Sequence, residues 1–344
     1  MTSIDTPQYL RHNRREDYGA RYTNDQLFIP STWLAVWKAA SPLGAIIGAV
    51  TGASFAHRFG RRLSLGTGTI ITAIGVALCL VSTLPSDITG RRAAFLVAKI
   101  VQGIGIGQIL ATVQTYVSEI VPPRLRGPAM SLLPLFTMLG QLIGAGVIAG
   151  QAGNTTSTAY FTPLASQLAF TMPPLLIAAI SPESPVWLLE KKRRPAAENS
   201  LLRLRRADED ITAIADNVTE AIHKDAHIQT SFADCFKGNE RRRTMIVLLA
   251  YISPQFWGVT LMANASYFAQ VLGMEESISL LVLVAGIVFG LLANVASIWT
   301  LANVRRRRLI LWGLGSSTFI WIAVGVANCF ANTATLWYDT FLSR

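Results

Sequence analysis

The fold of this chain is constrained most strongly by its long apolar stretches, which are joined by junctions that are alternately basic and nearly uncharged. Four junctions carry clustered basic residues, and the junctions between them carry little charge; the basic ones lie at 58–62, 124–127, 191–194 and 305–308. Cytoplasmic loops of polytopic membrane proteins are enriched in Lys and Arg. The pattern therefore predicts a chain that crosses a membrane many times, with every second loop in the cytoplasm.

The composition supports a membrane protein and argues against several other classes. Hydrophobic residues make up 51% of the 344 residues and charged residues 15%, with a mean hydropathy of +0.40. Most of the 30 Lys and Arg lie in the alternate loops, so the net charge of +10 does not predict nucleic-acid binding. The three cysteines are scattered without metal-ligand spacing. The four histidines lie outside the apolar stretches, and no catalytic arrangement is present, so we expect neither an enzyme nor a cofactor or metal.

Eight segments have the roughly 20 apolar residues that a membrane-spanning helix needs. We expect an all-α membrane protein whose spans are Ile29–Phe55, Leu63–Leu84, Ala93–Ile120, Ala129–Gly150, Tyr160–Ile180, Met245–Val271, Ile278–Leu301 and Leu309–Phe330. Glycines recur in three of them every three or four residues, which favours close helix packing within a membrane; they are Gly44, Gly48, Gly52, Gly103, Gly107, Gly140 and Gly144.

The spans divide the chain into five regions. Residues 1–28 form a polar segment that we expect to be flexible and that has no signal-peptide pattern. Residues 29–180 hold five spans, and 245–330 hold three. Between them, 181–244 is a cytoplasmic loop with helical stretches such as Leu201–Ile214, and 331–344 is a tail. The charge distribution places both termini outside.

Several motifs carry a resemblance to one family. Gly52 through Arg62 resembles the loop after the second helix of major facilitator transporters. The exit of the third predicted span and the start of the central loop resemble sugar-porter signatures, at Tyr116–Glu119, Arg124–Gly127 and Pro182–Leu188. Ser266–Phe268 and Arg306-Arg307 match the second half. The resemblance runs from about Tyr18 to Phe330 and is closest to fungal maltose and hexose permeases.

The resemblance implies a partial major facilitator fold and a transport function. The family has twelve helices; the first predicted span corresponds to its second helix and the last to its ninth. It implies a plasma-membrane transporter of a hexose or disaccharide, coupled to protons in the complete member, with sugar, protons and the lipid bilayer as partners. The alternative is a transport-inactive membrane protein that acts as a binding partner. We expect no concentrative uptake by these 344 residues alone, because the spans hold no carboxylate apart from Glu119 at a cytoplasmic end.

Four polar residues are the candidates for sugar binding. Sugars present many hydroxyls, which neutral amides and hydroxyls can bind as donors and acceptors. The resemblance places Gln141 and Gln255 at sugar-binding glutamines, although Pro254 replaces the partner of Gln255. Thr260 and Asn264 lie one helical turn apart and are candidates to line the same cavity. For a single glutamine, an interhelical hydrogen bond is the alternative, and we assign Gln102, Gln108, Gln114 and Gln167 that structural role.

Charged residues suggest two further sites. Lys99 lies deep within a span, where an ionisable group usually has a partner and a function. The resemblance places it at a position that the family uses in proton coupling. The alternative is a lysine whose ammonium group reaches the membrane surface. The resemblance also implies a cytoplasmic gate network, with loop charges that only set topology as the alternative; its members would be Arg61, Arg62, Glu119, Arg126 and Glu183. His57 and Val186 replace two charged residues of the family motifs, which we expect to loosen this network.

Overall fold

A computed structural model describes residues 21–23, 26–28, 31–82, 87–122, 125–151, 158–205, 210–226, 232–256 and 276–342. The chain forms two compact units. The first unit comprises Met1–Gln229 and Ala265–Leu292, and the second comprises Thr230–Asn264 and Ala293–Arg344. Helix α13, Glu276–Asn303, contributes residues to both.

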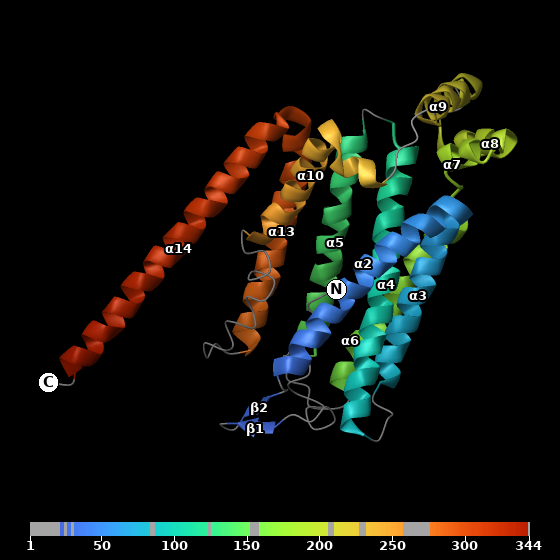
Figure 1. The fold of residues 1–344 in the computed structure, drawn as a ribbon. Coiled ribbons are helices and arrows are strands. Elements are labelled where there is room, and N and C mark those ends of the chain that lie inside the picture. Colours follow the sequence, from blue (N-terminus) through green and yellow to red (C-terminus); the bar gives the residue numbers. More distant parts are fainter. Residues whose placement is uncertain are drawn as a thin grey trace. The chain divides into compact units, whose positions relative to one another are not determined.

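Five long helices make up most of the first unit (Figure 1). They are α2 (Ser31–Phe59), α3 (Arg61–Val81), α4 (Ile88–Ile120), α5 (Arg126–Ala149) and α6 (Thr158–Ile180). Helix α4 packs extensively on both α2 and α3, and α6 packs on the other side of α3. The centre of this unit is therefore α4, which has neighbours along most of its length.

Six helices in the described part of the chain are long and apolar enough to cross a membrane. They confirm the first five predicted spans and the seventh, which lies in α13. Helix α14, Arg306–Leu342, covers the last predicted span as one continuous helix. Helix α10, Gly238–Phe256, covers only the start of the sixth predicted span, whose remainder lies outside the described residues. The predicted all-helical membrane fold is confirmed.

Helix α4 begins five residues before the predicted start of its span. The carboxylate of Asp87 accepts a hydrogen bond from the backbone N–H of Gly90 at 3.1 Å and caps the helix. Arg91 and Arg92 consequently belong to the first turns of α4 rather than to an outer loop. The guanidinium of Arg92 lies over the ring of Trp33 in α2, 5.6 Å from its centroid, and forms a cation–π contact between the two helices.

Glycines bring α2 and α4 close together. A Cβ atom added to Gly48 would overlap the carbonyl of Ile104, and one added to Gly107 would overlap the carbonyl of Ala45. The predicted packing role is confirmed for these glycines and for Gly44, Gly52 and Gly103, each of which meets a neighbouring helix. It is wrong for Gly140, whose added Cβ would meet no described atom within 4 Å.

Buried polar side chains connect α3 to α4. The Nε2 atom of Gln108 donates to the hydroxyl of Thr67 at 2.8 Å and to the carbonyl of Ser64 at 3.1 Å. The hydroxyls of Ser64 and Thr112 are 2.8 Å apart. These bonds confirm the structural role predicted for Gln108, since hydrogen bonds between helices remain favourable where water is excluded.

The central loop of the first unit contains three helices, α7 (Pro185–Glu190), α8 (Arg194–Leu204) and α9 (Ile211–Ala226), which lie together at one end of the long helices (Figure 1). The predicted helical stretch Leu201–Ile214 is wrong. Helix α8 ends at Leu204, and Arg205 has an extended backbone. The carboxylate of Asp210 starts α9 by accepting hydrogen bonds from the hydroxyl of Thr212 and from the backbone N–H groups of Ala213 and Thr212, and these bonds lower the pKa of Asp210.

The N-terminal segment contains a short hairpin that the sequence did not predict. Strand β1, Arg21–Thr23, pairs antiparallel with β2, Gln26–Phe28. Each strand has three residues, so the hairpin adds little regular structure to an otherwise helical chain.

The second unit contains the short helix η2 (Phe232–Phe236), α10, the end of α13 and α14. The hydroxyl of Thr244 in α10 donates to the carbonyl of Cys235 at 2.8 Å. This bond fixes η2 against the start of α10.

We predict that Gly107→Ala destabilises the protein by about 1–3 kcal/mol, because its methyl group would overlap the backbone of α2. Gly140→Ala is the matched control, since the new methyl would meet no described atom within 4 Å and alanine is favoured over glycine in a helix by roughly 0.5–1 kcal/mol. Thermal unfolding of the purified proteins in detergent measures the difference. Equal stability of the two variants would contradict the packing described for α2 and α4.

Candidate functional site

The corner between α2 and α3 positions the charged residues at the end of the first unit that the sequence predicts to be cytoplasmic. Only Gly60 separates the two helices, and its φ of +104° lies in the region that favours glycine. A side chain here would also overlap the carboxylate of Glu183, so the absence of a Cβ lets this carboxylate approach the backbone. The corner therefore requires glycine for two separate reasons.

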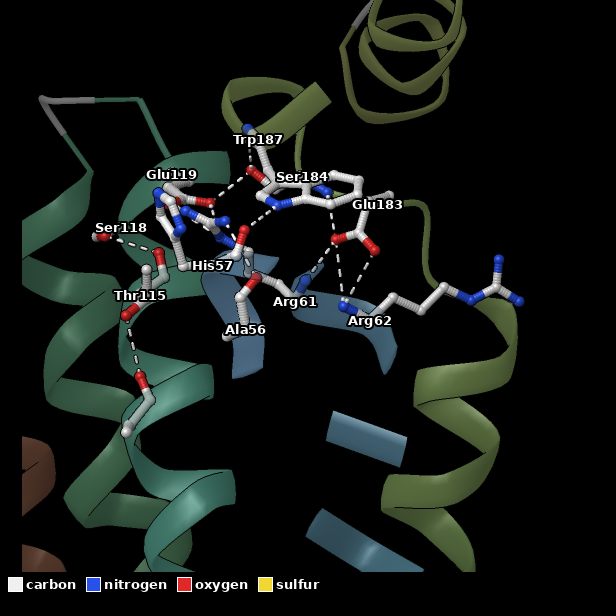
Figure 2. A network of polar contacts seen from close by, with 11 residues as sticks. Ala56, His57, Arg61, Arg62, Thr115, Ser118, Glu119, Glu183, Ser184 and Trp187 are labelled. Atoms are coloured by element: carbon white, nitrogen blue, oxygen red, sulfur yellow. Dashed lines mark hydrogen bonds and ion pairs between the residues drawn. The ribbon is translucent and has the colours of Figure 1, made fainter. Parts of the chain in front are cut away.

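Glu183 caps α3 from a distant part of the sequence. Its carboxylate accepts hydrogen bonds from the backbone N–H of Arg61 at 2.8 Å and of Arg62 at 3.2 and 3.3 Å (Figure 2). The first N–H groups of a helix have no partner within it, and the helix dipole favours an anion there. Gly60 precedes α3 and has no side chain, so Glu183 provides the cap that the local sequence lacks.

A buried ion pair joins α3 to α4. The Nη2 atom of Arg61 lies 2.6 Å from Oε1 of Glu119, and Nε lies 3.0 Å from Oε2. The two side chains are only 7% and 12% exposed. The hydroxyl of Ser184 donates to Oε2 of Glu119 at 2.5 Å, and the remaining guanidinium nitrogen of Arg61 donates to the carbonyl of Ala56 at 3.4 Å (Figure 2). Both charges are thus well supplied with hydrogen bonds.

The segment between α6 and α7, together with the start of α7, is fixed against α2 and α4. The indole N–H of Trp187 donates to the carbonyl of His57 in α2 at 2.9 Å. The phenol of Tyr116 in α4 donates to the carbonyl of Pro182 at 2.6 Å. The hydroxyl of Ser184 accepts from the N–H of Trp187 at 3.4 Å and caps α7. The central loop is therefore joined to the ends of the spans by specific hydrogen bonds.

The structure brings four of the five predicted gate residues together and places the fifth apart. Arg62 extends away from the Arg61–Glu119 pair (Figure 2), and its guanidinium donates to the carbonyls of Ala178 and Ala179 in the last turn of α6. Arg126 is the exposed first residue of α5 and forms no ion pair with any described residue. All the observed contacts lie within the first unit, so opening and closing of a gate stays a prediction.

Lys99 lies almost fully buried in α4, with 2% of its surface exposed. Its ammonium donates to the side-chain oxygen of Gln102 at 3.3 Å and lies 5.4 Å from the ring centroid of Phe95. The amide of Gln102 donates in turn to Gln167 of α6 at 2.9 Å. Lys99 is therefore not a snorkelling lysine. The structural role predicted for Gln102 and Gln167 is confirmed.

The predicted sugar-binding residues are only partly described. Gln141 is half-buried in α5, and its amide makes no hydrogen bond within the described ranges. Gln255 lies in the last turn of α10, and its side chain is outside the described part of the structure. Thr260 and Asn264 also lie outside the described residues. The role of these four residues in sugar binding stays a prediction.

Sequence reasoning missed three members of the cytoplasmic network. Ser184 and Trp187 belong to the Pro182–Leu188 motif and Tyr116 to the motif that contains Glu119, but only the charged members of these motifs were proposed as functional. The usable signal was the sequence Ser-Pro before an apolar turn, which is typical of a helix start with Ser as the cap.

Six apolar spans, glycine-mediated packing and a buried charge network at one end of the helices define a polytopic helical membrane protein with a transporter architecture. The family model described as Sugar (and other) transporter matches residues 4–340. The chain belongs to this family.

Three proteins similar to this chain in sequence are named as transporters, permeases or symporters. The chain is 24% identical to MFS transporter fmqE of Aspergillus fumigatus, over 94% of this chain and 59% of the relative. It is 28% identical to alpha-glucosides permease MPH3 of Saccharomyces cerevisiae, over 62% of this chain and 38% of the relative. It is 25% identical to the arabinose-proton symporter of Bacillus subtilis, over 85% and 62%. The chain therefore spans less than two thirds of the length of each of these relatives.

The fold is that of a solved major facilitator protein. The proton:xylose symporter XylE bound to 6-bromo-6-deoxy-D-glucose matches with a TM-score of 0.76 at 21% identity, over 90% of this chain and 67% of that structure. A partially occluded inward-open form of XylE from E. coli matches with a TM-score of 0.67 at 22% identity, over 90% and 70%. These matches confirm the predicted partial major facilitator fold.

We predict that Glu119→Gln destabilises the protein by about 3–5 kcal/mol, because it leaves the buried Arg61 without a counter-charge. Glu198→Gln is the matched control. Glu198 pairs with Arg194 at 2.9 Å at the surface, where the side chains are 32% and 51% exposed, and such pairs contribute less than about 1 kcal/mol. Denaturant unfolding in detergent compares them. If the Glu119→Gln variant were as stable as Glu198→Gln, the buried ion pair would contribute no more to the free energy of unfolding than the exposed one.

Proposed function

We propose that this chain forms part of a plasma-membrane transporter that moves a hexose or disaccharide together with protons. The observation that carries the proposal is the continuous family match over residues 4–340, which includes the loops that build the Arg61–Glu119 network. Relatives named as an alpha-glucoside permease and an arabinose-proton symporter support the substrate class and the coupling ion.

In this proposal, neutral polar side chains bind the sugar. Gln141 is the leading candidate, because its half-buried amide has both donor and acceptor atoms not used by the described residues. Gln255, Thr260 and Asn264 are the further candidates for contacts with sugar hydroxyls. Since each buried amide left unpaired costs roughly 1–3 kcal/mol, removing one contact should weaken sugar binding measurably.

The buried Lys99 is the candidate for the coupling group. Lys99 is held at a defined position by Gln102, and Gln102 is held by Gln167 of α6. A buried ionisable group that is linked in this way to a second helix is the kind of arrangement that coupling requires.

The cytoplasmic network would keep the first half rigid during transport. Alternating access in major facilitator proteins involves rocking of one half against the other around a central site. The Arg61–Glu119 pair and the Glu183 cap connect α2, α3, α4 and the segment after α6. A body held at several points in this way can move as a unit rather than deform.

Uptake of labelled glucose and maltose in a transporter-null yeast tests the proposal. Two proteins are compared: the 344 residues as written, and a hybrid in which an alpha-glucoside permease supplies the regions that the chain does not cover. We expect uptake by the hybrid that an uncoupler abolishes, and none by the 344 residues alone. Gln141→Ala in the hybrid should raise the sugar concentration for half-maximal uptake by about one to two decades.

Gln114→Ala is the control, because Gln114 is an exposed glutamine on α4 that was assigned no sugar contact. Unchanged sugar affinity in Gln141→Ala would remove Gln141 from the site. A well-expressed hybrid that transports neither sugar would favour the alternative, a transport-inactive membrane protein. Uncoupler-sensitive accumulation by the 344 residues alone would contradict the expectation that these spans, which hold no carboxylate apart from Glu119, do not support concentrative uptake.

A further inference from the structure

A cavity of about 640 Å³ lies beside the cytoplasmic network, where the start of α3 meets the segment after α6 and helix α8. Two arginines, Arg62 and Arg203, are among its lining residues. Among the described residues of the lining, only Glu183 carries a carboxylate, and this carboxylate already accepts the backbone N–H groups at the start of α3. Arg203 is exposed and forms no ion pair within the described ranges. The cavity is therefore suited to an anion.

A second cavity, of about 330 Å³, runs along the outer surface between α3 and α6. Its lining is apolar, with Ile70 and Ala73 from α3 and Leu168 and Leu175 from α6 among its residues. The two hydroxyls in the lining, from Thr69 and Thr171, each donate to a carbonyl of their own helix. The groove consequently offers only hydrocarbon contacts.

The two cavities lie on the same face of α3. The helical period places Arg62, Thr69 and Ala73 on one side, because they are separated by seven and four residues. The groove residues from Thr69 to Ala77 follow Arg62 by 7 to 15 positions, which corresponds to about 10–22 Å along the helix. One leaflet of a bilayer has a hydrocarbon thickness of about 15 Å. The groove therefore covers the depth of lipid acyl chains beneath the basic cavity.

Exposed apolar side chains lie at the start of α3 and at the end of α6, the ends of these helices near the basic cavity. Leu63 at the start of α3 and Ile177 and Ile180 at the end of α6 are 56%, 58% and 77% exposed. Large apolar groups next to a predicted membrane span are expected to face lipid. Both cavities thus lie on a surface that is expected to face the bilayer.

We propose that this surface binds an anionic phospholipid of the cytoplasmic leaflet. Its phosphate would lie between Arg62 and Arg203, and one acyl chain would occupy the groove between α3 and α6. Arginine binds phosphate through several N–H groups at once, and Nη1 of Arg62 makes no hydrogen bond within the described ranges. Because Arg62 also holds the end of α6, a bound lipid would contact the same corner that carries the cytoplasmic network.

Spin-labelled lipids test the proposal on the 344-residue chain in phosphatidylcholine nanodiscs. Electron paramagnetic resonance measures the motionally restricted fraction of labelled phosphatidic acid and of labelled phosphatidylcholine. We expect phosphatidic acid to be preferred, and Arg203→Gln to lower that preference about fivefold, the effect of one basic residue near an anionic membrane surface. Arg193→Gln is the matched control, because Arg193 is an exposed arginine before α8 that does not line the cavity.

Two further variants separate the parts of the site. Arg203→Lys should retain most of the preference, since it keeps the charge. Ala73→Phe should fill the groove and reduce binding of phosphatidic acid while leaving Arg203 intact. An equal loss in Arg193→Gln, or no loss in Arg203→Gln, would overturn the proposal in favour of diffuse attraction. Displacement of the labelled lipid by millimolar inorganic phosphate would overturn it in favour of a site for free phosphate.

Discussion

The ion pair between Arg61 and Glu119 is the interaction on which the cytoplasmic end of the first unit depends. Two charges that are about nine-tenths buried are stable only if their remaining hydrogen-bonding atoms are satisfied. That requirement determines the surroundings: Ser184 donates to the carboxylate, and the carbonyl of Ala56 accepts from the guanidinium. Removing either charge would leave the other buried and unpaired.

The position of this ion pair depends on how the helices that carry it are packed. Arg61 is the first residue of α3, so its position follows from the turn at Gly60 and from the cap that Glu183 supplies. Glycine contacts hold α2 against α4, and the amide of Gln108 holds α4 against α3. The charged corner and the three helices thus form one body. Arg62 points to the opposite side, where the proposed lipid site begins.

The sequence predicted most of the spans, because apolar length and basic loops are local signals. The candidate network residues came instead from the resemblance of the loop motifs to the family. The sequence did not predict how those residues act. Glu183 was expected to form ion pairs, yet it caps a helix 121 residues earlier in the chain, which no local pattern reveals. Arg126 was expected in the network and lies apart from it, because the family motif records residue types rather than side-chain directions. The break after Leu204 was missed because Asp210 was not recognised as a cap.

A double-mutant cycle on Arg61 and Glu119 tests the central claim most directly. The free energies of unfolding of Arg61→Ala, Glu119→Ala and the double variant are compared with that of the unchanged protein in detergent. If the buried pair organises this corner, the two substitutions are strongly non-additive, with a coupling energy of about 1–3 kcal/mol, and the double variant is little less stable than either single one. Additivity within about 0.5 kcal/mol would contradict the account, because it would show that each residue contributes independently of the other.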